Sequence, residues 1–499
     1  MKNAVNETLL AKVYDVAVET PLEKATKLSN ENGLPIYLKR EDLQPVHSFK
    51  IRGAYNKMVH LTAKEKKKGV IAASAGNHAQ GVALSAKKLD INATIVMPKT
   101  TPSIKVDAVK TYDAEVILWG DSYSDAYEHS QELVKKTGQA FIHPFDDPLV
   151  IAGQGTVGRE IIEQLPDATH IFIPVGGGGL ISGIAQFIKQ LEPHIKIIGV
   201  EPKDSNAMGL SLKAGKRIQL DHVGLFADGV AVKEVGENTF KICQKCVDEV
   251  ITVTNDQISA GIKAVFEDTR NIVEPAGALG VAGASKYFSE HSTKNAIAVA
   301  ICSGANMTFE RLQYVAERTL VGSGKEALFS VEMPEQAGAL EKFCLEVVNG
   351  HAITEFSYRL NSRESANIFV GIGLQNLADK EKFMAKMTKK EYKFEDLSSD
   401  ELVKKHVRHM IGGVSAKAKN EHFYEVLFPE RAGALTDFLR VVASRWNIST
   451  FHYRGQGSDT ANILVSFETT EPKTIENDLE VAEYQWERLS SKAINLFLR

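Results

Sequence analysis

The first 320 residues alternate short apolar runs with longer segments in which apolar positions recur with helical spacing. Residues 70–73, 93–97 and 115–118 have the length and composition of strands, whereas residues 79–89 and 104–112 have the pattern of amphipathic helices. This order of strand and helix predicts parallel sheets with helices on both faces. Because such sheets bind ligands at the carboxyl ends of their strands, the loops that follow the strands are the candidate functional positions.

A second stretch of the same kind runs from about residue 153 to residue 314. Its predicted strand at 171–175 is followed by four successive glycines and a predicted helix at 181–191. Four glycines leave backbone N–H groups unobstructed at the positive end of a helix, which favours a phosphate. The candidate phosphate-binding residues are Gly176, Gly177, Gly178, Gly179 and Leu180. A glycine-rich tight turn without a ligand is the alternative.

A glycine loop after a strand also occurs in dinucleotide-binding proteins, in which an acidic residue follows about 20 residues later. Glu201, directly after a predicted strand at 197–200, has that position. The spacing G-x-G-x-x-G is not met, however, because Ile181 or Ser182 stands at its last glycine. A dinucleotide enzyme is therefore the less favoured interpretation.

Lys50 lies in the segment Ser48-Phe49-Lys50-Ile51-Arg52-Gly53, just before a helix-compatible sequence. A lysine amine with the ordinary pKa of about 10.4 is a poor nucleophile at neutral pH, so a chemical role requires a desolvated or cationic environment. Phe49 supplies apolar surface, and we expect Arg52 to add a positive charge and Ser48 to allow a helix cap. The segment predicts a lysine that attaches a cofactor aldehyde covalently.

Two further polar sites follow predicted strands. A predicted turn after the strand at 70–73 consists of Ser74, Ala75, Gly76, Asn77 and His78. Ser303 follows the predicted strand at 296–301 and presents a hydroxyl where parallel sheets bind ligands. His78 and His143 are candidate proton carriers, with hydrogen-bonded structural histidines as the more common alternative.

The last third of the chain contains an internal repeat with an offset of 95 residues. Residues 335–340 recur at 430–435, residues 356–359 at 451–454, and residues 366–368 at 461–463. Each copy has the predicted order strand, helix, two strands, helix, strand, which is the ferredoxin-like arrangement. A short linker at 321–325 is predicted to separate this part from the preceding α/β part.

Composition limits the function classes. A chain of 499 residues is expected to hold two or three domains, and 43% hydrophobic and 24% charged residues are typical of a globular protein. A net charge of -4 and a pI near 6.4 give no electrostatic reason to expect nucleic acid or an anionic membrane as a partner. The apolar runs are far shorter than the ~20 residues of a membrane span, and residues 1–21 lack the apolar core of a secretory signal. We expect a cytoplasmic protein.

Lys50, the turn at 74–78, the four-glycine loop and Ser303, in this order, resemble the motifs of the tryptophan-synthase-β-like (fold type II) enzymes that depend on pyridoxal 5'-phosphate (PLP). The specific likeness is to the threonine dehydratase family. The resemblance implies covalent attachment of PLP to Lys50, its phosphate at Gly176 to Leu180, its ring hydroxyl near Asn77 and its pyridine nitrogen at Ser303. It also implies that residues 74–78 bind the substrate carboxylate and that Lys50 removes the substrate α-proton.

The repeated C-terminal part resembles ACT-like regulatory domains, which bind small amino acids. Together the resemblances imply a catalytic domain at 1–322, with a small subdomain at about 42–145, followed by ACT-like domains at 326–410 and 421–499. The implied fold class is α/β, with parallel sheets in the catalytic domain and two ferredoxin-like α+β domains after it.

The implied activity is that of a threonine ammonia-lyase, which converts L-threonine, and also accepts L-serine, in the committed step towards isoleucine. The products from threonine are 2-oxobutanoate and ammonia. The implied effectors are isoleucine, as inhibitor, and valine, which relieves the inhibition, and a homotetramer is implied as well. Tyr358 and Tyr453, in matching predicted strands, are candidates for effector contact, with cross-strand packing as the alternative. Glu201 could join a cation site, but no further ligand is identifiable, so no metal is predicted.

Two other interpretations remain open. A serine-directed PLP lyase, a racemase or a threonine synthase uses similar catalytic motifs, and the duplicated C-terminal part argues against each of these. A non-catalytic amino-acid sensor could keep both folds, and the presence of Lys50 and Ser303 argues against it.

Overall fold

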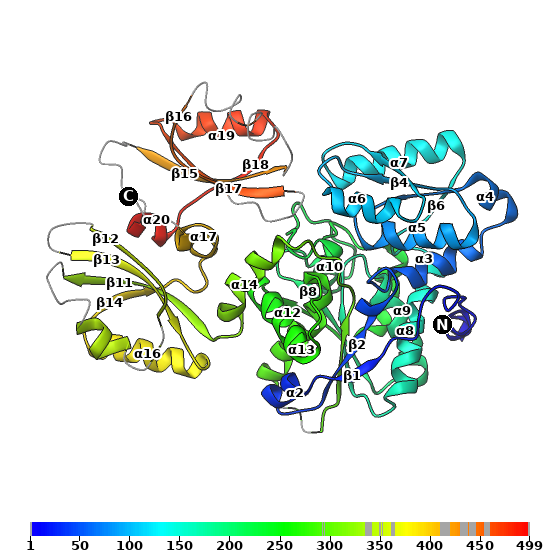
Figure 1. The fold of residues 1–499 in the computed structure, drawn as a ribbon, viewed down its shortest axis with the longest axis horizontal. Helices are drawn as coiled ribbons and strands as arrows, with labels where there is room; N and C mark the ends of the chain where they lie inside the picture. The colour runs from blue at the N-terminus through cyan, green and yellow to red at the C-terminus, as the bar shows by residue number, and fades with distance from the viewer. Residues whose placement is uncertain are drawn as a thin grey trace. The chain divides into compact units, whose positions relative to one another are not determined.

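The computed structural model of the chain describes residues 2–291, 293, 295–334, 342–348, 351, 353–360, 365–409, 420–429, 438, 446–453 and 460–497 (Figure 1). It divides into two compact units, Met1–Val315 and Ala316–Arg499, which we call the N-terminal unit and the C-terminal unit. The predicted domain boundary after residue 322 and the predicted subdomain limits at 42–145 stay predictions.

The N-terminal unit contains a six-stranded sheet in the order β1-β2-β10-β7-β8-β9. Neighbouring strands are parallel except β1 and β2, which are antiparallel at one edge. The strands are β1 (Leu22–Lys24), β2 (Ile36–Arg40), β7 (His170–Pro174), β8 (Lys196–Pro202), β9 (Glu249–Val253) and β10 (Ala298–Cys302). One face is covered by α8 (Pro148–Gln164) and α9 (Gly179–Leu191), and the other by α12 (Asn255–Thr269) and α13 (Pro275–Glu290) (Figure 1). We call this sheet and its helices the large subdomain.

Successive side chains along these strands pack into different cores. Phe172 of β7 packs with α12 and α13, whereas Ile171 and Ile173 pack with α8 and α9. In β10, Ala300 belongs to the first core and Ile301 to the second. Because both faces of the sheet are buried, its strands are continuous apolar runs, which is why the sequence pattern predicts them.

A four-stranded parallel sheet in the order β5-β4-β3-β6 forms the centre of a second layer. Its strands are β3 (Val70–Ala73), β4 (Ala93–Met97), β5 (Glu115–Leu118) and β6 (Ala140–Phe141). The surrounding helices are α3 (Lys50–Val59), α4 (Ala63–Lys68), α5 (Asn77–Leu89), α6 (Ser103–Lys110) and α7 (Tyr123–Thr137) (Figure 1). We call the sheet with α4 to α7 the small subdomain.

Shorter elements complete the N-terminal unit. They are α1 (Lys2–Leu9), α2 (Thr26–Asn32), η1 (Glu41–Leu43), α10 (Ala207–Ala214), η2 (Asp228–Val230) and α11 (Glu237–Cys246). The helix α14 (Arg311–Gly322) begins in the N-terminal unit and ends in the C-terminal unit. In the part of the chain that the structure describes, no helix combines the length and apolar character that a membrane crossing requires.

The C-terminal unit contains two four-stranded antiparallel sheets, in the orders β12-β13-β11-β14 and β16-β17-β15-β18. The first consists of β11 (Glu326–Pro334), β12 (Ile353–Leu360), β13 (Ser365–Gly373) and β14 (Lys393–Asp396). The second consists of β15 (Glu421–Pro429), β16 (Asn447–Tyr453), β17 (Thr460–Glu468) and β18 (Gln485–Arg488). Further helical segments are η3 (Cys344–Val348), α16 (Leu377–Lys389), α17 (Glu401–Lys405), η4 (Val407–His409), α19 (Pro472–Val481) and α20 (Lys492–Phe497).

The strand register repeats with the offset of the sequence repeat. Tyr358 pairs with Ile368 in the first sheet, and Tyr453 pairs with Ile463 in the second. The predicted fold class, parallel sheets followed by two antiparallel regulatory folds, is confirmed. The repeated motifs at 335–340 and 430–435, and the side chains of both tyrosines, lie outside the described residues.

Several element boundaries differ from the sequence prediction by one to three residues, as three examples show. The helix α5 begins at Asn77 rather than at residue 79, and α9 begins at Gly179 rather than at residue 181. The N–H groups of a first helical turn need no intrahelical acceptor, so polar and glycine residues that resemble a loop are tolerated there. The helix α14 continues to Gly322, through the start of the linker predicted at 321–325.

Candidate active site

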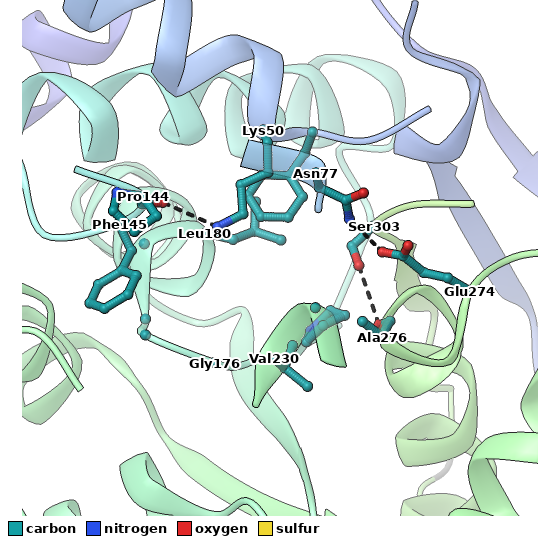
Figure 2. A pocket seen from close by; sticks show the side chains of 16 residues that line it. Lys50, Asn77, Pro144, Phe145, Gly176, Leu180, Val230, Glu274, Ala276 and Ser303 are labelled. Atoms are coloured by element: carbon teal, nitrogen blue, oxygen red, sulfur yellow. Dashed lines mark hydrogen bonds between the residues drawn. The ribbon is translucent and has the colours of Figure 1, made fainter. Parts of the chain in front are cut away.

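A pocket lies at the carboxyl ends of β7 and β10, with lining residues from both subdomains (Figure 2). It brings together Lys50, Asn77, the loop Gly176 to Leu180 and Ser303, all of which the sequence singled out. Four other members of the predicted turn are described but do not line this pocket: Ser74, Ala75, Gly76 and His78. The pocket therefore assembles one residue of that turn with the other three motifs.

Lys50 is the first residue of α3, and a short backbone pairing positions it. Ser48 forms an antiparallel bridge with Gly304, and the amide of Phe49 donates to the carbonyl oxygen of Ser303 at 3.2 Å. The chain just before Lys50 is thus attached to the chain that follows β10. This attachment holds Lys50 and Ser303 at the same end of the large sheet, although they are far apart in the sequence.

The Lys50 amine lies in a poorly solvated environment. Its Nζ donates to the Pro144 carbonyl oxygen at 3.1 Å (Figure 2). The same atom lies 5.3 Å from the centre of the Phe49 ring. Burial lowers the pKa of Lys50 to about 8, and the charge of Glu274 opposes this shift. The neutral, nucleophilic amine is therefore far more abundant at neutral pH than it is for a lysine in water.

Arg52 does not cause this shift, contrary to the expectation from the sequence. Its fully buried guanidinium pairs with Glu41 at 2.7 Å and with Glu160 at 2.5 Å, so two carboxylates balance its charge. Positions two apart on a helix point to different faces, which separates Arg52 from the lysine. The expected cap is also wrong: the N-cap of α3 is Phe49, and the N-cap makes no side-chain hydrogen bond.

The loop between β7 and α9 needs glycine because other parts of the chain lie against it. A Cβ at Gly176 would lie 2.9 Å from Cα of Val230, and a Cβ at Gly178 would lie 2.8 Å from Cβ of Thr239. Gly178 also has a φ of +94°, in the region that favours glycine. The Oγ1 of Thr239 donates to the carbonyl oxygen of Gly177 at 2.6 Å and holds the loop in place.

The amides of this loop are available to an anion. Gly179 and Leu180 begin α9, so their N–H groups have no intrahelical acceptor. Within the described residues, no oxygen accepts a hydrogen bond from the amides of Gly176, Gly177 or Gly178. The helix dipole adds partial positive charge at this end. The loop therefore has the donors and the charge that a phosphate group requires.

Asn77 is held at both ends of its side-chain amide. Its Nδ2 donates to Oε1 of Glu274 at 2.6 Å (Figure 2), and its Oδ1 accepts from Nδ2 of Asn306 at 2.7 Å. Asn77 belongs to the small subdomain, whereas Glu274 and Asn306 lie next to the large sheet. These contacts fix Asn77 in the pocket and connect the two subdomains.

Glu274 is a pocket residue that the sequence reasoning missed. It is the N-cap of α13, directly before Pro275, and its amide donates to the carbonyl oxygen of Gly304 at 3.1 Å. The helix approaches β10 closely because a glycine faces the strand: a Cβ at Gly280 would lie 2.9 Å from the amide nitrogen of Ile301. An acidic residue before a proline at a helix start was the available signal, and by itself it indicates only a cap.

The Glu274 carboxyl is buried, and it has an unusual proton affinity. Burial, with a smaller contribution from the charge of Asp228, raises the pKa of Glu274 to about 7, although the hydrogen bond from Asn77 opposes the increase. Glu274 can therefore hold or release a proton near neutral pH.

Four other residues of the pocket wall were not predicted from the sequence. They are Pro144 and Phe145 after β6, and Gly229 and Val230 of η2.

Ser303 follows β10 directly and is buried. Its Oγ donates to the carbonyl oxygen of Ala276 at 3.2 Å (Figure 2). A hydroxyl can donate or accept a hydrogen bond but carries no charge. The polar group at this strand end is therefore neutral.

The two candidate histidines have contacts that favour the structural interpretation. The Nε2 of His78 lies 2.8 Å from the carbonyl oxygen of Ile142, and burial, assisted by the charge of Lys50, lowers the pKa of His78 to about 3. The Nδ1 of His143 accepts from two backbone amides, the shorter bond being 2.8 Å from Asp146. Burial lowers the pKa of His143 as well. Both rings are therefore neutral and occupied by backbone partners.

Glu201 caps a helix. Its Oε1 accepts from the amide of Met208 and its Oε2 from the amide of Gly209, each at 2.8 Å. Burial raises the pKa of Glu201 to about 8. Each of its oxygens thus accepts a hydrogen bond from the first turn of α10. Among the described residues, no group of three or more His, Cys, Asp or Glu side chains is arranged to hold a metal ion.

Family models match almost the whole chain. Residues 13–304 match the model described as pyridoxal-phosphate dependent enzyme, and residues 317–407 and 412–498 match the C-terminal regulatory domain of threonine dehydratase. The curated L-threonine dehydratase biosynthetic IlvA of Burkholderia multivorans is 49% identical over 501 residues, which covers 99% of each chain.

Two solved structures resemble part of the chain. The processed form of threonine deaminase isoform 2 from Solanum lycopersicum is 53% identical, with a TM-score of 0.63, over 64% of this chain and 87% of that chain. Maize serine racemase is 34% identical, with a TM-score of 0.60, over 64% of this chain and 97% of that chain. The match to the racemase thus covers almost all of that enzyme but only 64% of this chain, whereas the match to the Burkholderia relative covers 99% of both chains.

Proposed function

Because this chain belongs to the pyridoxal-phosphate-dependent biosynthetic threonine dehydratases, we propose that it converts L-threonine to 2-oxobutanoate and ammonia in the pocket that contains Lys50. One observation carries the proposal. A lysine amine with a lowered pKa, a glycine loop at a helix N-terminus and a neutral strand-end hydroxyl line the same pocket. Each motif alone is common, and their combination fits this chemistry.

The pocket residues fit PLP. The loop Gly176 to Leu180 offers N–H donors at positions where a side chain would collide with Val230 or Thr239, which suits a phosphate. Lys50 would hold the cofactor aldehyde through Nζ, Asn77 would lie beside the ring hydroxyl, and Ser303 would lie beside the ring nitrogen. When bound, PLP supplies an acceptor for the electrons left on the substrate when its α-proton is removed.

Lys50 has the properties of the general base. Its pKa of about 8 means that Nζ can take up a proton from the substrate α-carbon near neutral pH. The Pro144 carbonyl oxygen and the nearby Glu274 carboxylate stabilise the positive charge that Nζ then gains. The hydroxyl leaves the β-carbon with the bonding electrons, and together with the proton taken from the α-carbon it accounts for the water that is lost. Hydrolysis of the resulting enamine consumes one water molecule and gives 2-oxobutanoate and ammonia.

Ser303 favours elimination over transamination. Its hydroxyl, unlike a carboxylate, does not keep a ring nitrogen protonated, so electron withdrawal is moderate. Moderate withdrawal is sufficient when the electrons depart at once with the β-hydroxyl. The helix α5 begins at Asn77, so the amides of its first turn need no intrahelical acceptor. We propose that the residues predicted at 74–78 receive the substrate carboxylate at this helix start.

A serine racemase is the alternative with the same catalytic motifs, as the likeness to the maize enzyme illustrates. The two regulatory-domain matches favour the dehydratase. Product analysis separates them, because a racemase returns an amino acid of inverted configuration and a dehydratase releases a keto acid.

We also propose that the C-terminal unit controls the dehydratase activity. Isoleucine, the end product, would inhibit it, and valine would relieve the inhibition. The two regulatory-domain matches and the duplicated strand register support a pair of effector sites. Such control requires a coupling free energy of ~1–3 kcal/mol between sites. Tyr358 and Tyr453 remain candidates for effector contact, and the homotetramer and cytoplasmic location stay predictions.

The test combines spectroscopy with an assay. The purified protein incubated with PLP is expected to gain visible absorbance, and borohydride reduction is expected to leave the cofactor on the peptide that contains Lys50. Lys50→Ala should lose both the absorbance and keto acid release from threonine. Lys57→Ala, on the same helix, is the control and should keep both. Retention of both properties by Lys50→Ala would end the proposal.

A further inference from the structure

Asp228 of η2 is paired with cations from two different elements. Its Oδ2 accepts from Nζ of Lys105 at 2.8 Å, and its Oδ1 accepts from Nη1 of Arg311 at 3.0 Å. Lys105 lies on α6 of the small subdomain, and Arg311 is the first residue of α14. We call Asp228, Lys105 and Arg311 the Asp228 junction. None of these three residues lines the pocket.

The junction is directly connected to the pocket wall. Gly229 and Val230, the two residues after Asp228, line the pocket (Figure 2 shows Val230). The Asp228 carboxylate also fixes this turn, because its Oδ1 accepts from the amide of Gly229 at 3.1 Å. A Cβ at Gly176 would lie 2.9 Å from Cα of Val230, so the wall is in contact with the phosphate loop. A shift of Asp228 would therefore be transmitted to that loop.

The Lys105 pair connects the two subdomains beside the pocket. Asn77 of the small subdomain makes further contacts of this kind, since it donates to Glu274 at 2.6 Å and accepts from Asn306 at 2.7 Å. The pocket has lining residues from both subdomains, so their separation determines its width. Losing Lys105 therefore removes one of the contacts that resist their separation.

Charges couple the junction to the pocket acid. Although burial alone would raise it, Lys105 and Arg311 hold the pKa of Asp228 well below its usual range, so the carboxylate is ionised at neutral pH. Burial is the largest cause of the raised pKa of Glu274, and the negative charge of Asp228 is the second largest. The positive charges of Lys105 and Arg311 lower the pKa of Glu274. A change in the junction thus alters both the position of the wall and the field at Glu274.

The helix α14 connects the junction with the C-terminal unit. Arg311 begins this helix in the N-terminal unit, and its Nη1 also donates to the carbonyl oxygen of Phe226 at 3.3 Å. Near the other end, Arg318 pairs with Glu401 at 2.8 Å, and the carbonyl oxygen of Glu317 accepts from Arg408 at 2.9 Å. The same helix is therefore attached to Asp228 at its start and to the regulatory fold at its end.

We propose that Asp228 is a positioning residue that holds the pocket wall and the small subdomain together through Lys105 and connects both to the regulatory unit through Arg311. Asp228 acts on substrate and cofactor only through the wall that it supports. The identities of the cofactor and effector used in the tests rest on the proposed function, whereas the exchange measurement below does not.

The first test measures cofactor retention. Lys105→Met keeps most of the length of the side chain and removes its charge, and we expect the PLP dissociation constant to rise at least about fivefold. Asp228→Asn should have the same effect, and Asp228→Glu, which keeps the charge, should recover most of the affinity. Lys110→Met, at an exposed position of the same helix, is the matched control. Affinities within twofold of the wild type in both Lys105→Met and Asp228→Asn would overturn the proposal.

The second test measures the regulatory connection in the full-length protein. Arg311→Met should raise the isoleucine concentration for half-inhibition at least about fivefold, because it removes the contact of α14 with the wall. Arg217→Met, which removes a surface pair with Glu234 at 3.5 Å, is the control. An unchanged isoleucine response in Arg311→Met would overturn the regulatory part of the proposal.

A third measurement needs no ligand. Hydrogen–deuterium exchange of the peptide that contains η2 should become faster in Lys105→Met, Asp228→Asn and Arg311→Met, and should stay unchanged in Lys110→Met. Unchanged exchange in the three junction variants would overturn the positioning role. A wild-type protein that binds no PLP and releases no keto acid would instead contradict the proposed function, and the exchange result would still decide the junction.

Discussion

Replacing Arg52 by methionine should strongly destabilise the N-terminal unit. The guanidinium of Arg52 pairs with Glu41 and Glu160 and also donates to Oγ1 of Thr156 at 3.1 Å, and the charged groups of all three ionic residues are almost completely buried. Methionine replaces the apolar stem of arginine but has no donors. Lys39, paired with Glu160 at 2.6 Å, remains to balance one of the two carboxylates. The variant therefore leaves uncompensated negative charge in the core.

Removing one partner of a buried ion pair costs about 3–5 kcal/mol of folding free energy, and we expect a loss of this size. Arg159→Met is the matched control, because Arg159 pairs with Glu163 at 2.8 Å on the exposed side of α8. An exposed pair of this spacing contributes about 0.3–0.5 kcal/mol. The two losses should therefore differ roughly tenfold.

Urea unfolding followed by tryptophan fluorescence measures these losses. The chain has three tryptophans, so a Trp446→Phe/Trp486→Phe background leaves Trp119 as the reporter of the N-terminal unit. A loss below about 1 kcal/mol in Arg52→Met, the upper range of an exposed pair, would refute the reasoning.

The pH dependence of this difference has a definite sign. Although burial opposes the change, the charge and hydrogen bonds of Arg52 lower the pKa of Glu41 below its ordinary value of 4.5. In the wild type this contribution to stability is present above pH 4.5 and is lost as the pH falls through the lower folded-state pKa. The variant lacks the contribution at every pH. The stability difference between the two proteins should therefore shrink in acid.

Four further outcomes are expected. Gly178→Ala should weaken PLP binding at least about tenfold, because φ is +94° and the new Cβ would collide with Thr239. Gly215→Ala is the control and should leave PLP binding unchanged, because Gly215 has a φ of +68° but open space around it. Equal affinities of the two variants in a cofactor titration would contradict the phosphate assignment. The rate of PLP attachment to the cofactor-free protein, followed by absorbance, should rise with pH about a midpoint near 8, because only the neutral Lys50 amine reacts, and a midpoint near 10.5 would contradict the desolvated environment. In Glu274→Gln that midpoint should move to lower pH, because the carboxylate that stabilises the protonated amine is gone, and an upward shift would show that the sign is wrong. Truncation after Gly322 should leave keto acid release from threonine and remove the isoleucine response, so inhibition of the truncated protein would place the effector site outside the C-terminal unit.

Several parts of the site could be predicted because they depend on residues close together in the sequence. The four glycines follow a strand and precede a helix, and Ser303 follows another strand of the same parallel sheet. Parallel pairing brings the carboxyl ends of such strands to one edge, so sequence order alone predicts that the two motifs meet. The 95-residue repeat likewise predicted the duplicated register of the C-terminal sheets.

The tertiary structure decided what depends on burial and on distant partners. Arg52 was expected to act on Lys50, but Glu41 and Glu160, from other elements, surround its charge. Glu274 entered the pocket because α13 packs closely against β10, and its shifted pKa arises from that burial. Local patterns determine which residues can form strands, turns and helix ends, whereas desolvation and charge pairing are set by the packing of segments remote in the sequence.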